Sequence, residues 1–189
     1  MRQLFQLWSG DNPQNVPLDF LDNVEKLIAD RKEQLKSANM GSSGENQDQS
    51  YRSSKVMWLS DAFWIRDFFF NNYIQPANKA AFGVDVHNMA DIQYTEYHAS
   101  EGGKYHTHID TFWESQSHFD RKLSLTVQLS DPSDYEGGDF YFDGYENPQN
   151  GKSKGSVLIF PSYLPHGVTP LTKGSRRSLV MWFDGPRWR

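Results

Sequence analysis

Apolar and polar positions alternate with a helical period near the start of the chain. Within residues 17–36 the apolar positions are three or four residues apart, which is the spacing of one face of an α-helix. These positions are Leu18, Leu21, Val24, Leu27 and Ile28. Pro17 suits the first turn of this helix, where an N–H has no intrahelical partner. A second helical pattern covers residues 60–82, with Ser60 as a candidate cap.

From residue 84 the pattern changes to short runs of β-branched and aromatic residues, separated by Gly, Pro, Asn and Asp. Such runs are typical of strands joined by turns. They cover residues 84–99, 122–130, 138–145, 156–164 and 175–183. Two helices followed by many antiparallel strands predict an α+β protein that is mainly β, a sandwich or jelly roll with the N-terminal helices packed on one sheet.

Length and composition narrow the class of protein. A chain of 189 residues suits a single domain, here 1–189, and no linker or internal repeat divides it. The net charge of −5 argues against stable binding to nucleic acid, which favours a positive excess. The chain has no cysteine, which excludes disulfides and thiol nucleophiles and fits a cytoplasmic location. We see no apolar run long enough for a signal peptide or a membrane span.

Residues 39–54 form a polar, glycine-rich stretch without periodicity between the two expected helices. A long loop inside a compact domain is commonly functional. We therefore consider this stretch a candidate flap over a binding site.

The stretch GKYHTHIDTF, residues 103–112, contains the first candidate for chemistry. Side chains at every second position of a strand point the same way, so His106, His108 and Asp110 are expected to share a face. His166 supplies a third candidate ligand beside His108 and Asp110. Two imidazoles and one carboxylate on one face of a metal form the recurring site of non-haem Fe(II) oxygenases.

Arg176, ten residues after His166, strengthens this interpretation. A strand through Arg176 places Ser178, Val180 and Trp182 on the same face. The planar guanidinium binds a carboxylate through two parallel hydrogen bonds, and a buried one needs an anion. A cosubstrate that chelates the metal at one end and carries a carboxylate at the other would supply that anion.

Four ordered motifs carry a resemblance to a known family. They are Y-x-x-H-x-D at 105–110, R-x-x-S at 121–124, E-G-G-x-x-x-F at 136–142, and His166 followed by Arg176. Over residues 92–184 the chain resembles prolyl 4-hydroxylase-type 2-oxoglutarate/Fe(II) dioxygenases, and PKHD-type bacterial members in particular. The resemblance implies a double-stranded β-helix as the catalytic core, residues 91–184, with residues 1–90 as helical support.

The same resemblance implies the roles of individual residues. His108, Asp110 and His166 would hold Fe(II) and form the catalytic centre. Arg176, Tyr97 and Gln128 would contact 2-oxoglutarate, although Tyr97 lies one residue further from the H-x-D motif than in the family, and Gln128 replaces an aromatic hydroxyl. Tyr105, Arg121 and Trp182 match positions that line a peptidyl-proline pocket.

The implied reaction is hydroxylation of a prolyl residue in a peptide or protein. It consumes O2 and 2-oxoglutarate and yields succinate and CO2, with ascorbate as a further candidate cofactor. Two alternatives stay open. The same cofactors could oxidise another side chain, a free amino acid or a nucleobase, or an H-x-H pair of His106 and His108 could belong to a non-catalytic, cupin-like binding module. The sequence does not fix the oligomeric state.

Overall fold

The computed structural model describes residues 3–12, 15–38, 48–149 and 151–189, which build two antiparallel sheets. The larger sheet has the strand order β1-β10-β7-β12-β5-β4-β2, and β8 pairs with β12. Its strands are β1 (Gln6–Trp8), β2 (Lys36–Ser37), β4 (Lys55–Trp58), β5 (Ala90–His98), β7 (Phe119–Gln128), β8 (Tyr135–Gly137), β10 (Val157–Pro161) and β12 (Leu171–Pro186). The smaller sheet has the order β3-β6-β11-β9. Its strands are β3 (Arg52–Ser53), β6 (Lys104–His108), β9 (Phe140–Phe142) and β11 (His166–Val168).

The helices are shorter and less regular than the sequence pattern predicts. They are α1 (Leu18–Asp30), α2 (Phe63–Phe69) and α3 (Gln75–Ala77), with π-helical turns η2 (Phe70–Ile74) and η3 (Asn78–Phe82) and 3-10 turns η1 (Lys32–Gln34), η4 (Ala99–Glu101) and η5 (Pro132–Asp134). The prediction that the first helix reaches residue 36 is wrong, because the chain there already pairs with β4 as strand β2. Ser60 does not cap the second helix. Its hydroxyl accepts the Ile92 N–H of β5 instead, at 3.1 Å.

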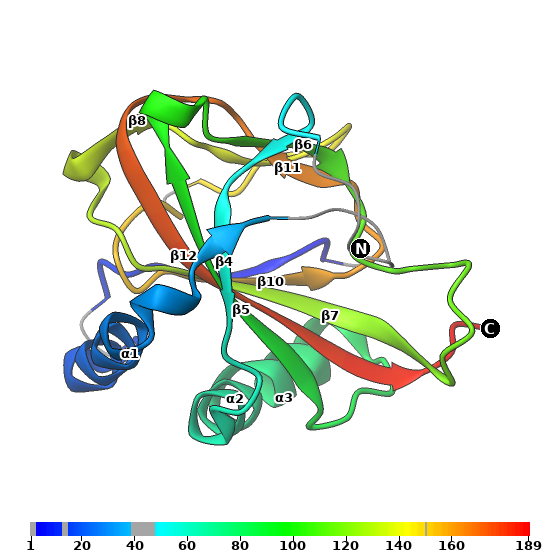
Figure 1. The fold of residues 1–189 in the computed structure, drawn as a ribbon. Coiled ribbons are helices and arrows are strands. Elements are labelled where there is room, and N and C mark those ends of the chain that lie inside the picture. Colours follow the sequence, from blue (N-terminus) through cyan, green and yellow to red (C-terminus); the bar gives the residue numbers. More distant parts are fainter. Residues whose placement is uncertain (1–2, 13–14, 39–47, 150) are drawn as a thin grey trace.

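The helices cover one face of the larger sheet, below it in Figure 1. Alternate residues of the central strands bury apolar side chains against α1, α2 and the π-helical turns, as period-2 alternation requires. Ile92 of β5, Leu125 of β7 and Met181 of β12 belong to this core, together with Val24 of α1 and Phe69 of α2. The mainly-β prediction with helices on one sheet is therefore confirmed.

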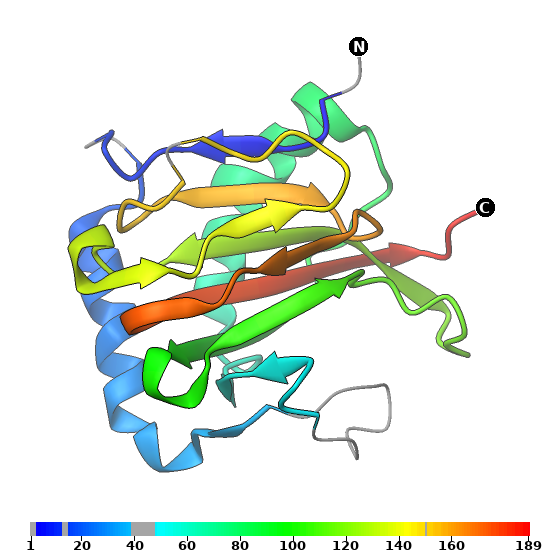
Figure 2. The ribbon, with the colours of Figure 1, turned by 90° about the horizontal axis from the view of Figure 1, so that it is seen from above.

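The opposite face of the larger sheet is more polar and faces the smaller sheet. Thr95 of β5, Thr126 of β7 and Ser178 of β12 lie on this face and line a cavity of about 290 Å³. The long strand β12 crosses the whole molecule between β5 and β7 (Figure 2). The two sheets thus form a jelly roll whose interior holds the cavity.

None of the helices in the described residues is both long and apolar enough to cross a membrane.

Most of the stretch considered as a flap, residues 39–47, lies outside the described residues, so the flap stays a prediction. Its described end carries β3, which pairs with β6 of the smaller sheet.

Candidate metal centre and its pocket

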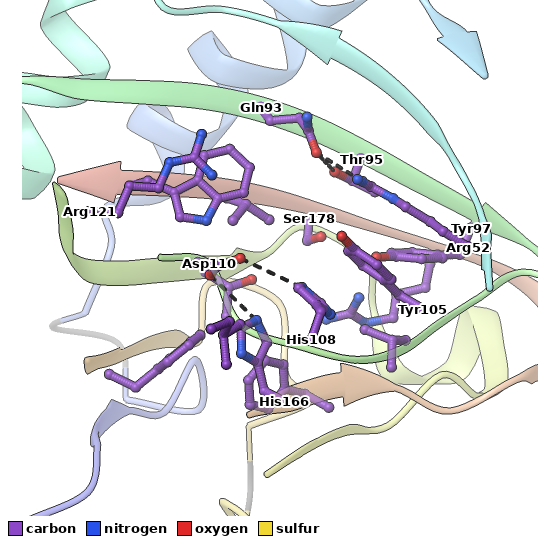
Figure 3. A pocket seen from close by; sticks show the side chains of 18 of the residues that line it. Arg52, Gln93, Thr95, Tyr97, Tyr105, His108, Asp110, Arg121, His166 and Ser178 are labelled. Atoms are coloured by element: carbon purple, nitrogen blue, oxygen red, sulfur yellow. Dashed lines mark hydrogen bonds and ion pairs between the residues drawn. The ribbon is translucent and has the colours of Figure 1, made fainter. Parts of the chain in front are cut away.

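Three side chains converge inside the cavity, one from β6, one from β11 and one from the segment that follows β6. His108 is the last residue of β6 and pairs in register with His166, the first residue of β11. Asp110 follows β6 and is held by its N–H, which donates to the Ser162 carbonyl at 2.8 Å. One ligand atom from each of the three lies within 4.8 Å of the others. Figure 3 shows the Asp110 carboxylate joined by dashed lines to both imidazoles.

The tautomers of both imidazoles fit a bound cation. The Nδ1 of His108 donates to the His106 carbonyl at 2.9 Å, and the Nδ1 of His166 donates to the Leu164 carbonyl at 2.8 Å. A carbonyl can only accept, so each ring carries a proton on Nδ1, and its Nε2 is the nitrogen that can bind a metal. These Nε2 atoms lie 3.6 and 3.4 Å from Asp110 Oδ1 and Oδ2. A divalent metal ion satisfies all three groups, and the backbone carbonyls orient its ligands.

The environment keeps the carboxylate charged and one imidazole neutral. Burial alone would raise the pKa of Asp110, but His166, His108 and the Ser124 hydroxyl together hold that pKa well below its ordinary value. Ser124 Oγ donates to Asp110 Oδ2 at 2.6 Å and contacts Ser162 Oγ at 2.9 Å. Burial lowers the pKa of His166, against the attraction of Asp110. A charged carboxylate and a neutral imidazole are the forms that bind a metal.

The expectation that His106, His108 and Asp110 share one strand face is wrong. On β6, His108 pairs with His166 of β11, and Tyr105 pairs with Val168. The two β6 residues are three positions apart and their β11 partners only two, so the register shifts between them. This β-bulge turns Tyr105 and His108 into the cavity. His106 is exposed and is not part of the metal cluster. The H-x-H pair of a cupin-like module is therefore not formed.

Arg176 lies further along the same cavity, on β12. It is 5% exposed, and it forms no ion pair with any described carboxylate. Its guanidinium carbon lies 5.7 Å from the ring centroid of Tyr97, its cross-strand partner on β5. Gly138 packs against it, because a Cβ there would approach Arg176 Cδ to 3.2 Å. A buried guanidinium without a counter-charge fits the far carboxylate of a dicarboxylic acid.

The two other residues predicted to contact the cosubstrate lie in different surroundings. Tyr97 lines the cavity that contains the metal cluster. Gln128 lines an adjacent polar cavity that shares Arg176 and Thr126 with the first, and its Nε2 donates to the Tyr135 hydroxyl at 2.7 Å. Gln128 therefore lines the adjacent cavity and not the one that contains the metal ligands, and its contact with a cosubstrate stays a prediction.

The three residues predicted to contact substrate all line the metal cavity. Tyr105 stacks on the His108 imidazole with 3.6 Å between ring centroids, and burial raises its pKa to about 12. Arg121 lies on the other side of Asp110 in Figure 3, with its guanidinium 4.1 Å from the ring centroid of Trp182. The buried Trp182 Nε1 has no acceptor among the described residues, so it can donate to a bound molecule.

Sequence reasoning missed Arg52, a further cationic residue of the cavity. It lies on β3, and its guanidinium carbon is 4.4 Å from the Tyr105 ring centroid. The only sequence signal was a basic residue at the end of a polar stretch. Because strand β3 has two residues, neither its existence nor its pairing with β6 follows from periodicity.

Comparisons with known proteins agree with this geometry. A sequence model of the 2OG-Fe(II) oxygenase superfamily matches residues 92–184. A PKHD-type hydroxylase of Gloeothece citriformis is 30% identical over 166 residues, covering 87% of this chain and 66% of that protein. A PKHD-type hydroxylase of Synechococcus sp. is 40% identical over 85 residues, covering 44% of this chain and 37% of that protein. The matched part is thus less than two thirds of the length of these relatives.

Solved structures share the fold at low sequence identity. A prolyl-4-hydroxylase of Pseudomonas putida superposes with a TM-score of 0.70 at 18% identity, covering 98% of this chain and 94% of that chain. A prolyl hydroxylase of Trichoplax adhaerens, in complex with a peptide fragment of the hypoxia inducible factor oxygen degradation domain, also gives 0.70, at 16% identity, covering 95% and 83%. The predicted double-stranded β-helix fold is confirmed, and its bounds at residues 91–184 stay a prediction.

Proposed function

Because this chain belongs to the 2OG-Fe(II) oxygenase superfamily, we propose that it is a 2-oxoglutarate-dependent hydroxylase that acts on a prolyl residue in a peptide or protein. The observation that carries the proposal is the convergence, in one cavity, of a His-Asp-His cluster and a buried arginine that forms no ion pair with a described carboxylate. The first supplies three ligands on one side of a metal, and the second supplies a carboxylate site at the far end of a cosubstrate.

In this proposal His108, Asp110 and His166 hold Fe(II), and Arg176 holds the far carboxylate of 2-oxoglutarate beside Tyr97. When bound, iron and 2-oxoglutarate supply an O2-dependent oxidation that converts the oxoacid to succinate and CO2 and hydroxylates a C–H bond. The protein places that bond and excludes water. Ser124 keeps the Asp110 carboxylate oriented through its 2.6 Å hydrogen bond.

The prolyl assignment rests on the shape and polarity of the cavity mouth together with the relatives. Tyr105 and Trp182 contribute aromatic rings to the lining of the cavity that contains the metal ligands, which suits a pyrrolidine ring. The unpartnered Trp182 N–H can donate to a backbone carbonyl of the substrate. The solved relatives named above include one with a bound peptide fragment. Ascorbate as a reductant and a cytoplasmic location stay predictions.

The test is a hydroxylation assay on a library of proline-containing peptides. The protein is incubated with Fe(II), 2-oxoglutarate and O2, and succinate and peptide masses are measured together. We expect succinate formation that depends on peptide and a gain of one oxygen on proline. One oxygen on another residue would overturn the prolyl assignment and leave the oxygenase intact, whereas no succinate with any substrate class would overturn the oxygenase.

A further inference from the structure

Arg52 is a second buried arginine in the metal cavity, and the proposed reaction leaves it unused. It is 9% exposed and reaches the cavity from β3, across the Tyr105 ring. Its Nε donates to Ser54 Oγ at 2.8 Å. Its Nη2 donates to Gln93 Oε1 at 2.9 Å, and Figure 3 draws this second hydrogen bond. Both acceptors are neutral. No ion pair joins Arg52 to a carboxylate in the described part of the chain.

The donors of Arg52 are only partly satisfied. A guanidinium has five N–H donors and stays charged at any physiological pH. Two of the five are used by Ser54 and Gln93, and the side chain makes no further hydrogen bond to a described residue. A buried cation with free donors gains most from an anion that uses two of them at once.

A comparison of the positive and negative charges in the cavity distinguishes Arg52 from the other two arginines. With the proposed function as premise, Arg176 and Fe(II) are balanced by Asp110 and the two carboxylates of 2-oxoglutarate. Arg121 is paired with Asp91, Nη2 to Oδ2 at 3.2 Å. Among the described residues that line the cavity, Arg52 therefore keeps a positive charge that no described carboxylate and neither cofactor balances.

We propose that Arg52 recognises a carboxylate of the substrate, so that the preferred substrate is an acidic segment with its carboxylate near the target proline. The position of Arg52 suits this role. Its guanidinium lies against Tyr105, and the other face of that ring is covered by the His108 imidazole. A carboxylate held by Arg52 is thus one aromatic ring away from a metal ligand, which leaves the neighbouring residue of a peptide to reach the metal.

The test compares matched peptides that differ only in charge. Blocked peptides contain Glu-Pro, Gln-Pro, Pro-Glu or Pro-Gln between glycines, and a further pair ends in proline as the free acid or the amide. These arms separate an acidic side chain from a terminal carboxylate as the source of the anion. Two quantities are measured: the KM for hydroxylation, and equilibrium binding to the protein loaded with Fe(II) and 2-oxoglutarate without O2.

Three variants make the test specific. In Arg52→Gln the guanidinium is absent. Ser54→Asp keeps the guanidinium but gives it an internal carboxylate at the position that now accepts from Nε. Lys55→Gln is the matched control, because this neighbouring cation pairs with Glu101 at 2.5 Å and does not line the metal cavity.

We expect the wild-type protein and Lys55→Gln to prefer one acidic peptide over its neutral counterpart by about 10–100-fold. Arg52→Gln and Ser54→Asp should both abolish this preference and leave 2-oxoglutarate binding unchanged. Equal use of acidic and neutral peptides by the wild type would overturn the inference while the hydroxylase stands. Selective binding of acidic peptides without hydroxylation would instead support the carboxylate site and contradict the prolyl assignment. Loss of 2-oxoglutarate binding in Arg52→Gln would also overturn it, because Arg52 would then serve the cosubstrate.

Discussion

His108 and His166 are register partners on the antiparallel strands β6 and β11, with 4.3 Å between their ring centroids. Each ring donates its Nδ1 proton to the carbonyl of the residue two positions earlier. One pair of neighbouring strands therefore fixes the position, the tautomer and the direction of both imidazoles. Asp110 completes the cluster from the segment that follows β6, and Ser124 and Ser162 hold it from two further strands or strand ends.

Replacing Ser124 by alanine should weaken metal binding by about 10–100-fold, because residues that orient a ligand contribute to affinity without touching the metal. The change removes the 2.6 Å bond that holds Asp110 Oδ2. Ser130→Ala is the control, since this buried serine accepts the Arg177 N–H at 2.8 Å and lies outside the cavity. Calorimetric titration with Mn(II) measures both. Equal affinity in the two variants would show that Ser124 does not position the ligand.

Replacing Arg176 by glutamine should raise the Kd for 2-oxoglutarate by about 10–100-fold, the effect expected when hydrogen bonds to a charged group are lost. Metal affinity without 2-oxoglutarate should not change. Arg177→Gln is the matched control, because successive side chains of a strand point to opposite faces and Arg177 therefore points away from the cavity. Its Nη1 lies 3.5 Å from Oε2 of Glu25 in α1. If Arg177→Gln weakened 2-oxoglutarate binding as strongly as Arg176→Gln, the assignment of the far carboxylate to Arg176 would be wrong.

Glycine at position 138 should be required for two reasons: the backbone there has a positive φ, and the Arg176 side chain packs closely against it. Both Gly138 and Gly144 have positive φ, at +61° and +76°, so alanine at either should cost about 1–2 kcal/mol of folding free energy. At Gly138 the added Cβ also meets Leu171 Cδ1 at 2.7 Å and Arg176 Cδ at 3.2 Å, whereas nothing lies within 4 Å at Gly144. We expect both variants to unfold at lower denaturant concentration, and only Gly138→Ala to weaken 2-oxoglutarate binding. A similar loss of binding in Gly144→Ala would refute this packing role.

The sequence predicts the gathering of His108, Asp110, His166 and Arg176 because ordered motifs carry them. It also predicts which residues of β12 share the face toward the cavity. All four of them line it: Arg176, Ser178, Val180 and Trp182. It does not predict the bulge in β6, because a register shift depends on the partner strand β11 and leaves no local pattern. Strict alternation therefore misplaced His106 beside the metal ligands.

Arg52 shows a second limit of sequence reasoning. Its place in the cavity depends on a two-residue strand that pairs with β6 across about 50 residues of chain, and such long-range pairing has no periodic signal. The predicted end of the first helix is wrong for a related reason. Tertiary pairing overrides helical propensity at residues 36–37, where the chain joins the sheet as β2.

The most direct measurement of the central claim is an anaerobic titration with Fe(II) and 2-oxoglutarate, followed by the visible charge-transfer absorption of the iron–oxoacid chelate. We expect the absorption in the wild type and in His106→Ala, whose side chain is exposed and lies outside the metal cluster. It should be lost in His108→Ala and in His166→Ala. Full absorption in His108→Ala, or its loss in His106→Ala, would contradict the ligand set on which the account depends.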